Sequence, residues 1–272
     1  MELDQHDVDM DGIRIRYWET GKGEPLLLVH GTGPGAGSRG YWRKMLEPLA
    51  QDFHVIAYDL IGFGESARKP QPPYFDSTLW QRQARFMLEQ FGGAPANVMA
   101  HSLSGATILA LAAERLPTIK KVMTTGTLGA SLPISQDAIQ GWTFPADEQA
   151  LRSTAEMLVY DAGLIDDQYI QGRMKTLFSG DYGSYFAEMF QGDQQRFIDE
   201  VALSDEQLAN IDCEVLMVHG RNDRPASFQS SMELAEKIKR ADLFVLDRCG
   251  HSVAFEHPEK LLWLARGFFL QR

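Results

Sequence analysis

The stretch Val-Met-Ala-His-Ser-Leu-Ser-Gly-Ala at residues 98–106 decides the fold. Its first apolar residues are typical of a buried strand, and the apolar run after Gly105 is typical of a helix. Ser102 stands at the corner between them, with small residues, Ala100 and Ser104, two positions away on either side. Such a corner can hold a serine on a tight, strained turn that exposes its hydroxyl. The usual pattern has glycine at both flanking positions, so an ordinary serine at a helix N-terminus is the alternative.

Two later strand-to-loop junctions supply the partners that a nucleophilic serine needs. One apolar stretch leads into a polar turn that ends at Asp223, and another leads into a loop that ends at His251. Because the carboxyl ends of parallel strands lie at one edge of a sheet, both loops are expected near Ser102. His251 would take the proton of the Ser102 hydroxyl, and Asp223 would fix the imidazole tautomer. The order Ser, Asp, His therefore predicts a catalytic triad, although Asp223 alone would more simply cap the next helix.

A glycine-rich loop, His-Gly-Thr-Gly-Pro-Gly-Ala-Gly at residues 30–37, follows an apolar stretch at 26–29. In an architecture of this kind that loop donates one backbone N–H to a tetrahedral oxyanion, and the residue after the nucleophile donates the other. We therefore assign the two donors to Thr32 and Leu103. Each such donor lowers the barrier by about 3–4 kcal/mol.

The same loop has a second interpretation, as a nucleotide-binding turn. Residues 35–40 match Gly-x-Gly-x-x-Gly, and Asp59 ends a later apolar stretch, as in a dinucleotide-binding unit. In such a unit the first glycine should follow the strand directly, whereas Gly35 lies several residues past it, behind a proline. This interpretation also leaves Ser102 and its partners unexplained. No Gly-Lys-Ser/Thr follows the loop, and we expect no cofactor.

Composition limits the class of protein. The chain has 272 residues, which suits one large α/β domain, and its formal net charge is −11, which disfavours nucleic acid and anionic membranes. Two cysteines give no disulfide framework, and no histidine spacing indicates a metal site. No apolar run approaches the ~20 residues that span a bilayer, and the N-terminal residues lack the apolar segment of a signal peptide. We expect a cytoplasmic protein with a small-molecule substrate, and no metal, nucleic-acid or membrane partner.

Apolar stretches and helical patterns alternate along most of the chain, which predicts a mostly parallel, twisted sheet with helices on both faces. A hairpin is expected to turn at Asp11-Gly12. Further strands are expected at residues 26–29, 54–58, 97–100, 121–125, 214–218 and 243–246. Helices are expected at 42–49, 79–91, 105–115, 232–239 and 258–270.

One long segment breaks this alternation. Almost ninety residues separate the fourth and fifth of these parallel strands, and they show only helical patterns, at 147–159, 166–178, 182–190 and 194–201. A structureless loop of that length is implausible. We therefore expect residues 133–210 to form a helical cap inserted into a core made of residues 1–132 and 211–272.

On these residues the chain resembles the meta-cleavage product hydrolases. These are C–C bond hydrolases of bacterial aromatic-ring degradation, within the α/β-hydrolase superfamily. The resemblance rests on the glycine loop at 30–36, Asp-Leu-Ile-Gly-Phe-Gly-Glu-Ser at 59–66, the serine corner, Val-His-Gly-Arg-Asn-Asp at 218–223 and Asp-Arg-Cys-Gly-His at 247–251. It implies an α/β-hydrolase fold, a Ser102–His251–Asp223 triad and no cofactor. It also implies hydrolysis of a 2-hydroxy-6-oxo-dienoate. Members of this family are commonly oligomeric, so the resemblance is compatible with a homo-oligomer.

The resemblance also implies a set of substrate-binding residues. Arg173 lies where the family has a cap arginine that holds the acidic end of the substrate, although a solvated charge on a helix face is the alternative. The chain departs from the family at His101 and Tyr41, which replace asparagines, and at Ser252, which replaces a tryptophan. These departures keep a carboxylesterase, lactonase or amide hydrolase as an alternative, and a non-hydrolytic binding module as another. The residues expected to contact substrate are Gly31, Gly33, Tyr41, His101, Trp142, Arg173 and Ser252.

Overall fold

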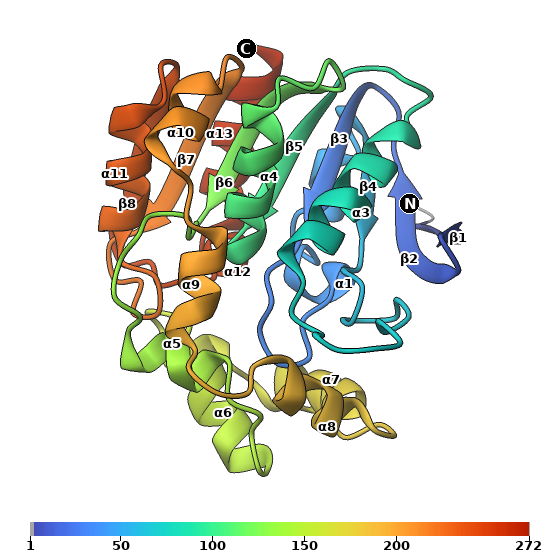
Figure 1. Cartoon of the computed structure of the whole chain (residues 1–272), viewed down its shortest axis with the longest axis vertical. Helices are drawn as coiled ribbons and strands as arrows, with labels where there is room; N and C mark the ends of the chain where they lie inside the picture. Colours follow the sequence, from blue (N-terminus) through green and yellow to red (C-terminus); the bar gives the residue numbers. More distant parts are fainter. Residues whose placement is uncertain (1–2, 272) are drawn as a thin grey trace.

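A twisted eight-stranded sheet runs through the molecule in the computed structural model, which describes residues 3–271 (Figure 1). The strand order is β1-β2-β4-β3-β5-β6-β7-β8. The hairpin β1–β2 and the pair β2–β4 are antiparallel, and the other neighbours are parallel. The strands are β1 (Asp4–Met10), β2 (Ile13–Thr20), β3 (Glu24–Val29), β4 (Phe53–Tyr58), β5 (Ala96–His101), β6 (Ile119–Thr125), β7 (Glu214–Gly220) and β8 (Ala241–Leu246).

Helices cover both faces of the sheet (Figure 1). Those in the core segments are α1 (Ser38–Tyr41), α2 (Leu46–Leu49), α3 (Ser77–Glu89), α4 (Leu103–Ala113), α11 (Phe228–Lys237), α12 (Val253–Glu256) and α13 (Pro258–Leu270). Between β6 and β7 lie α5 (Gln136–Gly141), α6 (Glu148–Met157), the short 3₁₀ helix η1 (Ala162–Leu164), α7 (Asp167–Leu177), α8 (Tyr182–Met189), α9 (Gln195–Val201) and α10 (Asp205–Asn210). Of these, α5 to α9 lie beyond the lower edge of the sheet in Figure 1.

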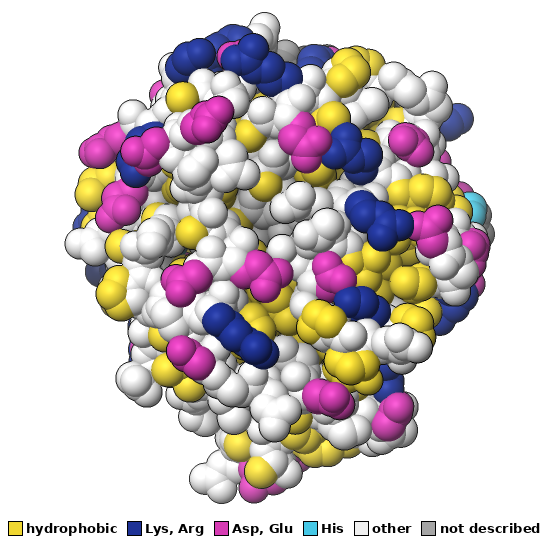
Figure 2. All heavy atoms as spheres, viewed as in Figure 1, with side chains coloured by type: hydrophobic (Ala, Val, Ile, Leu, Met, Phe, Trp, Pro, Cys, Tyr) yellow, Lys and Arg dark blue, Asp and Glu magenta, His cyan; other side chains and the backbone are white. Residues whose placement is uncertain are grey.

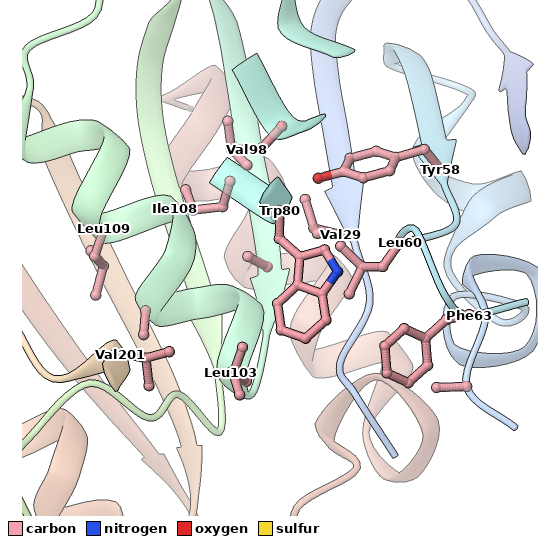
Figure 3. Packing of buried hydrophobic residues seen from close by; sticks show 14 of the residues in the cluster. Val29, Tyr58, Leu60, Phe63, Trp80, Val98, Leu103, Ile108, Leu109 and Val201 are labelled. Atoms are coloured by element: carbon pink, nitrogen blue, oxygen red, sulfur yellow. The ribbon is translucent and has the colours of Figure 1, made fainter. Parts of the chain in front are cut away.

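The sheet divides the core into two apolar layers. Because neighbouring side chains of a strand point to opposite faces, Leu27 of β3 belongs to one layer and Leu28 to the other. The first layer contains Trp80 of α3 and Ile108 of α4, which lie between these helices and the strands (Figure 3). The second contains Phe269 of α13. Burial on both faces explains why the central strands are continuous apolar runs rather than alternating ones.

The predicted α/β architecture is confirmed, with the parallel strands at the expected places and the hairpin turning at Asp11-Gly12. The helix expected at residues 42–49 is wrong. Only residues 46–49 of that range are helical, as α2, and the single-turn helix α1 ends just before it at Tyr41. The two helices are joined by a tight turn in which the Met45 amide donates to the Trp42 carbonyl. Trp42 and Met45 are both fully buried, and the turn brings them together against the sheet.

The structure describes every residue between β6 and β7, and this segment contains helices joined by loops and no strand. Its last helix, α10, packs against α4 and α11 of the core rather than over the edge of the sheet. A capping box between Ser204 and Gln207 begins this helix. Within residues 3–271, no helix combines the length and apolar character needed to cross a membrane.

Candidate active site

Ser102 occupies a strained corner between β5 and α4. Its φ of 58° and ψ of −129° lie in a region that residues other than glycine rarely adopt. The corner is fixed by two hydrogen bonds, from the Ser102 amide to the Thr125 carbonyl at 2.9 Å and from the Ser104 hydroxyl to the His30 carbonyl at 2.6 Å. The serine that replaces the usual glycine at position 104 therefore ties the corner to the end of β3. At Gly105, an added Cβ would meet the Thr127 hydroxyl, so this position admits no side chain.

The structure brings the three predicted catalytic side chains into one hydrogen-bonded chain. His251 Nε2 lies 3.0 Å from Ser102 Oγ, and His251 Nδ1 lies 2.7 Å from Asp223 Oδ2. A carboxylate only accepts, so Nδ1 carries the proton and the free Nε2 lone pair accepts from the serine hydroxyl. All three residues come from loops at the carboxyl ends of β5, β7 and β8. This geometry allows the imidazole to remove the serine proton.

A second histidine, His219, also contacts the Asp223 carboxylate, and sequence reasoning missed this role. Its Nε2 donates to the Ala226 carbonyl at 2.8 Å and lies 3.1 Å from Asp223 Oδ2, while its Nδ1 accepts from the Ser231 hydroxyl at 2.7 Å. The amide of Ala226 donates to the other carboxylate oxygen at 2.8 Å. The only signal in the sequence is that His219 stands four residues before Asp223 at the end of an apolar run.

These contacts set the charge of Asp223. Burial by itself favours the neutral acid, but the attraction of His251 and the hydrogen bonds from His219 and His251 outweigh it. The pKa of Asp223 is therefore lowered below its usual value. Gly126 leaves room for this arrangement, since its φ is 53° and an added Cβ would lie 3.0 Å from His251 Nδ1 and 3.1 Å from Asp223 Oδ2.

The two backbone amides that we expect to bind an oxyanion belong to Thr32 and Leu103. Leu103 is the first residue of α4, so its N–H has no acceptor within the helix. Thr32 lies in the loop after β3, lines the same cavity as Ser102, and its hydroxyl accepts from Trp142 Nε1 at 3.2 Å. His30, which begins this loop, is fully buried, and its Nε2 accepts from the Leu60 amide at 3.0 Å. Its burial lowers the pKa to about 4, which keeps the ring neutral and structural.

His101, beside the nucleophile, is held between two other rings. It stacks on Tyr41 with centroids 4.1 Å apart, and its centroid lies 4.6 Å from that of His251. His101 Nδ1 lies 2.9 Å from the Thr125 carbonyl, so this nitrogen carries the proton and Nε2 is left as an acceptor. Burial, and then the nearby His251, lower the pKa of His101 well below its usual value. The ring is thus a neutral hydrogen-bond acceptor in the wall of the site.

The hydroxyl of Ser102 opens into a cavity with about 670 Å³ of empty space. Arg173 of α7 reaches its wall, where its guanidinium donates to the Pro34 carbonyl at 2.7 Å and lies over the Tyr169 ring. Leu103 and Asp223 are not part of the lining, because Leu103 offers only its amide and Asp223 lies behind His251. Every residue expected to contact substrate lines this cavity: Gly31, Gly33, Tyr41, His101, Trp142, Arg173 and Ser252.

The nucleotide-binding interpretation of the glycine loop finds no support in the geometry. Asp59 is buried, and its two carboxylate oxygens accept from the backbone amides of Ser38, at 2.6 Å, and Glu65, at 2.7 Å. The carboxylate thus anchors the loop and is not free for a ribose hydroxyl. Among residues 3–271, no group of three or more His, Cys, Asp or Glu side chains is placed to hold a metal ion.

With this site in view, comparison with known proteins identifies the family. The sequence profile of the alpha/beta hydrolase fold family matches residues 24–258. The chain belongs to the α/β-hydrolase family. Among curated members, it is similar to the 2-hydroxymuconate semialdehyde hydrolase of Pseudomonas sp. (strain CF600), with 30% identity over 260 residues that cover 96% of this chain and 92% of that protein.

Solved structures of α/β-hydrolases agree with this relation. The meta-cleavage product hydrolase from Pseudomonas fluorescens IP01 superimposes with a TM-score of 0.94 at 26% identity, covering 99% of this chain and 98% of that one. The 2-hydroxy-6-oxo-6-phenylhexa-2,4-dienoate hydrolase from Rhodococcus sp. strain RHA1 superimposes with a TM-score of 0.91 at 25% identity, covering 99% of both chains. The resemblance to C–C bond hydrolases of aromatic degradation thus extends over nearly the whole molecule.

Proposed function

We propose that this α/β-hydrolase cleaves a C–C bond in a 2-hydroxy-6-oxo-dienoate, the type of compound that results from fission of an aromatic ring. The observation that carries this proposal is that the Ser102 hydroxyl, hydrogen-bonded to the His251–Asp223 pair, shares one cavity with the cation of Arg173. The similarity to hydrolases whose names specify 2-hydroxymuconate semialdehyde and 2-hydroxy-6-oxo-2,4-heptadienoate supports the choice of substrate.

The reaction begins with ketonisation of the bound dienol. This step turns the substrate into a diketone and makes its C5–C6 bond, next to the 6-oxo group, cleavable. Arg173 would hold the carboxylate end during this step, because an arginine fork binds carboxylates through paired, charge-assisted hydrogen bonds. Its contacts with Pro34 and Tyr169 fix the guanidinium before substrate arrives. A fixed anchor places the 6-oxo carbon against Ser102, which lowers the entropic part of the barrier.

Cleavage then follows the chemistry of acyl transfer. Ser102 Oγ forms a bond to the 6-oxo carbon while its proton passes to His251 Nε2, and the oxyanion is bound by the amides of Thr32 and Leu103. When the C–C bond breaks, its electron pair goes to the dienoate fragment, which takes the proton from His251. Water, activated by His251, then hydrolyses the acyl-serine to release the carboxylic acid. Asp223 stabilises the imidazolium in both halves.

We further propose that residues 133–210 act as the cap over this reaction, inserted into a core made of residues 1–132 and 211–272, with the last helix of the cap, α10, resting on that core. Trp142 and Arg173 come from this segment and line the cavity. A cap that closes over the substrate excludes water from the ketonisation step and strengthens the electrostatic interactions inside.

Turnover of 2-hydroxymuconate semialdehyde and related dienoates tests the proposal, since cleavage removes their visible absorbance. We expect hydrolysis by the native protein and none by Ser102→Ala. Arg173→Gln should raise KM about 10- to 100-fold, the range for losing one hydrogen-bonded charge partner. Arg196→Gln, on the exposed side of α9, is the matched control and should leave KM unchanged. Failure of the native protein to cleave any member of the panel rejects the proposal.

A second function, hydrolysis of an ester, lactone or amide, is favoured by one specific observation. The Tyr41–His101 stack gives the cavity wall beside Ser102 an aromatic surface where the C–C hydrolases have asparagines. Ester hydrolysis needs only the serine, the imidazole and the oxyanion donors, and it does not need ketonisation. Rapid cleavage of aryl acetates together with inert dienoates would establish this function instead.

A further inference from the structure

A second hollow lies against the catalytic cavity, between α1 and α7 and beside β2. It holds about 1350 Å³ of space open to solvent. Three residues line both hollows, namely Ala36, Tyr41 and Arg173, so the two hollows are neighbours that share part of their walls. By contrast, the hollow bordered by Glu156 and Arg224 shares no lining residue with the catalytic cavity. The hollow beside α7 is therefore adjacent to the catalytic cavity, and Arg173 stands in the wall of both.

This hollow is lined by four cations from two different parts of the fold. Arg39 belongs to α1 and Arg43 follows it, whereas Arg173 and Lys175 belong to α7. We call the hollow the cationic groove. Within the described residues, none of these four side chains forms an ion pair with a carboxylate; the arginines instead lie over aromatic rings, Arg39 over Trp18 and Arg43 over Tyr169.

Elsewhere on this acidic protein, many cations are paired with carboxylates. Arg14, Lys120 and Arg240 each lie within 2.8 Å of a carboxylate oxygen. Figure 2 shows acidic and basic side chains interspersed over one face in this way. The cationic groove differs in that four cations without a carboxylate partner among residues 3–271 line one hollow of a chain whose net charge is −11.

The two carboxylates of the cationic groove do not neutralise it. Glu65 pairs with Arg16 at 2.8 Å, and Arg16 is not part of the groove lining. Asp59 is buried, and its oxygens are occupied by the backbone amides of Ser38 and Glu65. The positive charge of the groove is therefore available to an incoming anion.

We propose that the cationic groove is the route by which carboxylate substrates reach Ser102, and that Arg39, Arg43 and Lys175 select anions for the site. Its walls are built from the core on one side and from α7 on the other, so a substrate passing along it arrives at Arg173. A charged, low-dielectric cleft concentrates ligands of opposite sign and raises association rates by about 10- to 1000-fold. The inference rests on the proposed function only in taking the natural substrate to be an acid.

A matched pair of esters tests the groove independently of C–C cleavage. 4-Acetoxybenzoate carries a carboxylate, and its methyl ester is neutral, while both present the same acetyl group to Ser102. At an ionic strength of about 0.05 M, the triple variant Arg39→Gln, Arg43→Gln, Lys175→Gln should lose about 10-fold in kcat/KM for the acid and keep its activity on the methyl ester. In about 0.5 M salt, where charges are screened within a few ångströms, the difference between variant and native protein should disappear.

The control is a second triple variant with the same change in net charge, Lys22→Gln, Lys237→Gln, Lys239→Gln. These lysines are exposed and line neither hollow. The proposal is overturned if this control loses as much activity on the acid, or if the groove variant loses activity equally on both esters. If the groove triple variant does not fold, the proposal is tested with Lys175→Gln alone and with the salt dependence of kcat/KM for the acid in the native protein. A preference for the acid that salt does not reduce contradicts the proposal.

The outcomes separate this inference from the proposed function. If dienoates are inert but the charged ester shows the expected loss, the groove stands and C–C hydrolysis fails. If dienoates are cleaved and the charge of the groove has no effect on them or on the esters, C–C hydrolysis stands and the groove fails. For the dienoates, the matched pair is the free acid and its methyl ester.

Discussion

Two imidazoles lie against the Asp223 carboxylate, and together they decide its charge. His251 Nδ1 lies 2.7 Å from it and His219 Nε2 lies 3.1 Å from it. Burial opposes ionisation, but the two histidines outweigh it, so the pKa of Asp223 is lowered below its usual value. Asp223 is therefore already ionised at the pH values where an imidazole titrates. A loss of activity in acid should therefore not come from protonation of Asp223.

Replacing His219 by phenylalanine tests whether His219 helps to set the charge of Asp223. With the His219 ring removed, the Asp223 carboxylate loses one polar neighbour and interacts more strongly with the His251 imidazolium that forms during catalysis. We expect the acid limb of kcat/KM for His219→Phe to move upward by about half a unit to one unit. The alkaline plateau should stay within about threefold of the native value, since the Ser102–His251 contact remains.

Ser231→Ala is the control for this experiment. It removes the hydroxyl that donates to His219 Nδ1 but leaves the His219 ring against Asp223 in place, so a smaller shift in the same direction is expected. An unchanged acid limb in His219→Phe would mean that His219 only fills space.

The sequence predicts the role of a residue when that role depends on its place at the end of a strand. It does not predict the role of a residue that depends on contacts with distant parts of the chain. Ser102, Asp223 and His251 each follow an apolar strand, so their convergence could be predicted from the parallel sheet. The stack of His101 on Tyr41 joins positions sixty residues apart, and no spacing in the chain indicates it. His219 was missed because its ring is buried at a strand end, where a histidine has no characteristic pattern.

At the scale of elements, the strands were predictable because burial on both faces leaves a continuous apolar run. The short helices were not: α1, α2 and α5 have only four to six residues each, too few to show a periodic pattern. How the helices between β6 and β7 pack over the site also lay beyond prediction. Their contacts with the core are made by single side chains such as Trp142.

Trp142, which follows α5, contacts both Phe190 at the end of α8 and Thr32 in the glycine loop. Its ring stacks on Phe190 with centroids 5.3 Å apart and an interplanar angle of 10°, and its Nε1 donates to Thr32 Oγ1 at 3.2 Å. The indole therefore both packs the helical segment and positions the residue that we propose as an oxyanion donor. These two roles can be separated by substitution.

Trp142→Phe keeps an aromatic ring against Phe190 and removes the hydrogen bond to Thr32. We expect kcat for a neutral aryl acetate to fall about 3- to 10-fold, with a loss of unfolding free energy near 1 kcal/mol, about the worth of one hydrogen bond. Trp142→Ala also removes the stacked ring and should cost about 3–5 kcal/mol. Steady-state kinetics and urea unfolding measure the two effects. An unchanged kcat in Trp142→Phe would show that Thr32 needs no support from the indole.

At the scale of the whole molecule, the net charge of −11 and the cationic groove act on an anionic substrate in opposite directions. Which of the two effects is larger depends on the electrostatic screening length, which is set by the salt concentration. At an ionic strength of about 0.1 M the screening length is about 10 Å, so an anion near the groove responds mainly to the local cations. At about 0.01 M it is about 30 Å, comparable to the size of the molecule, and the distant carboxylates contribute as well.

Removing distant negative charge should therefore help an anionic substrate only at low salt. Three exposed carboxylates lie far from α1 and α7, on elements at the β8 edge of the sheet (upper left in Figure 1): Glu206 on α10, Glu236 on α11 and Asp242 on β8. We expect the triple variant Glu206→Gln, Glu236→Gln, Asp242→Asn to raise kcat/KM for 4-acetoxybenzoate about two- to threefold at about 0.01 M, with no change at about 0.1 M. The methyl ester should respond at neither salt concentration, because it carries no charge. A gain that persists at the higher salt concentration would show that these carboxylates act through the structure of the site and not through the field of the molecule.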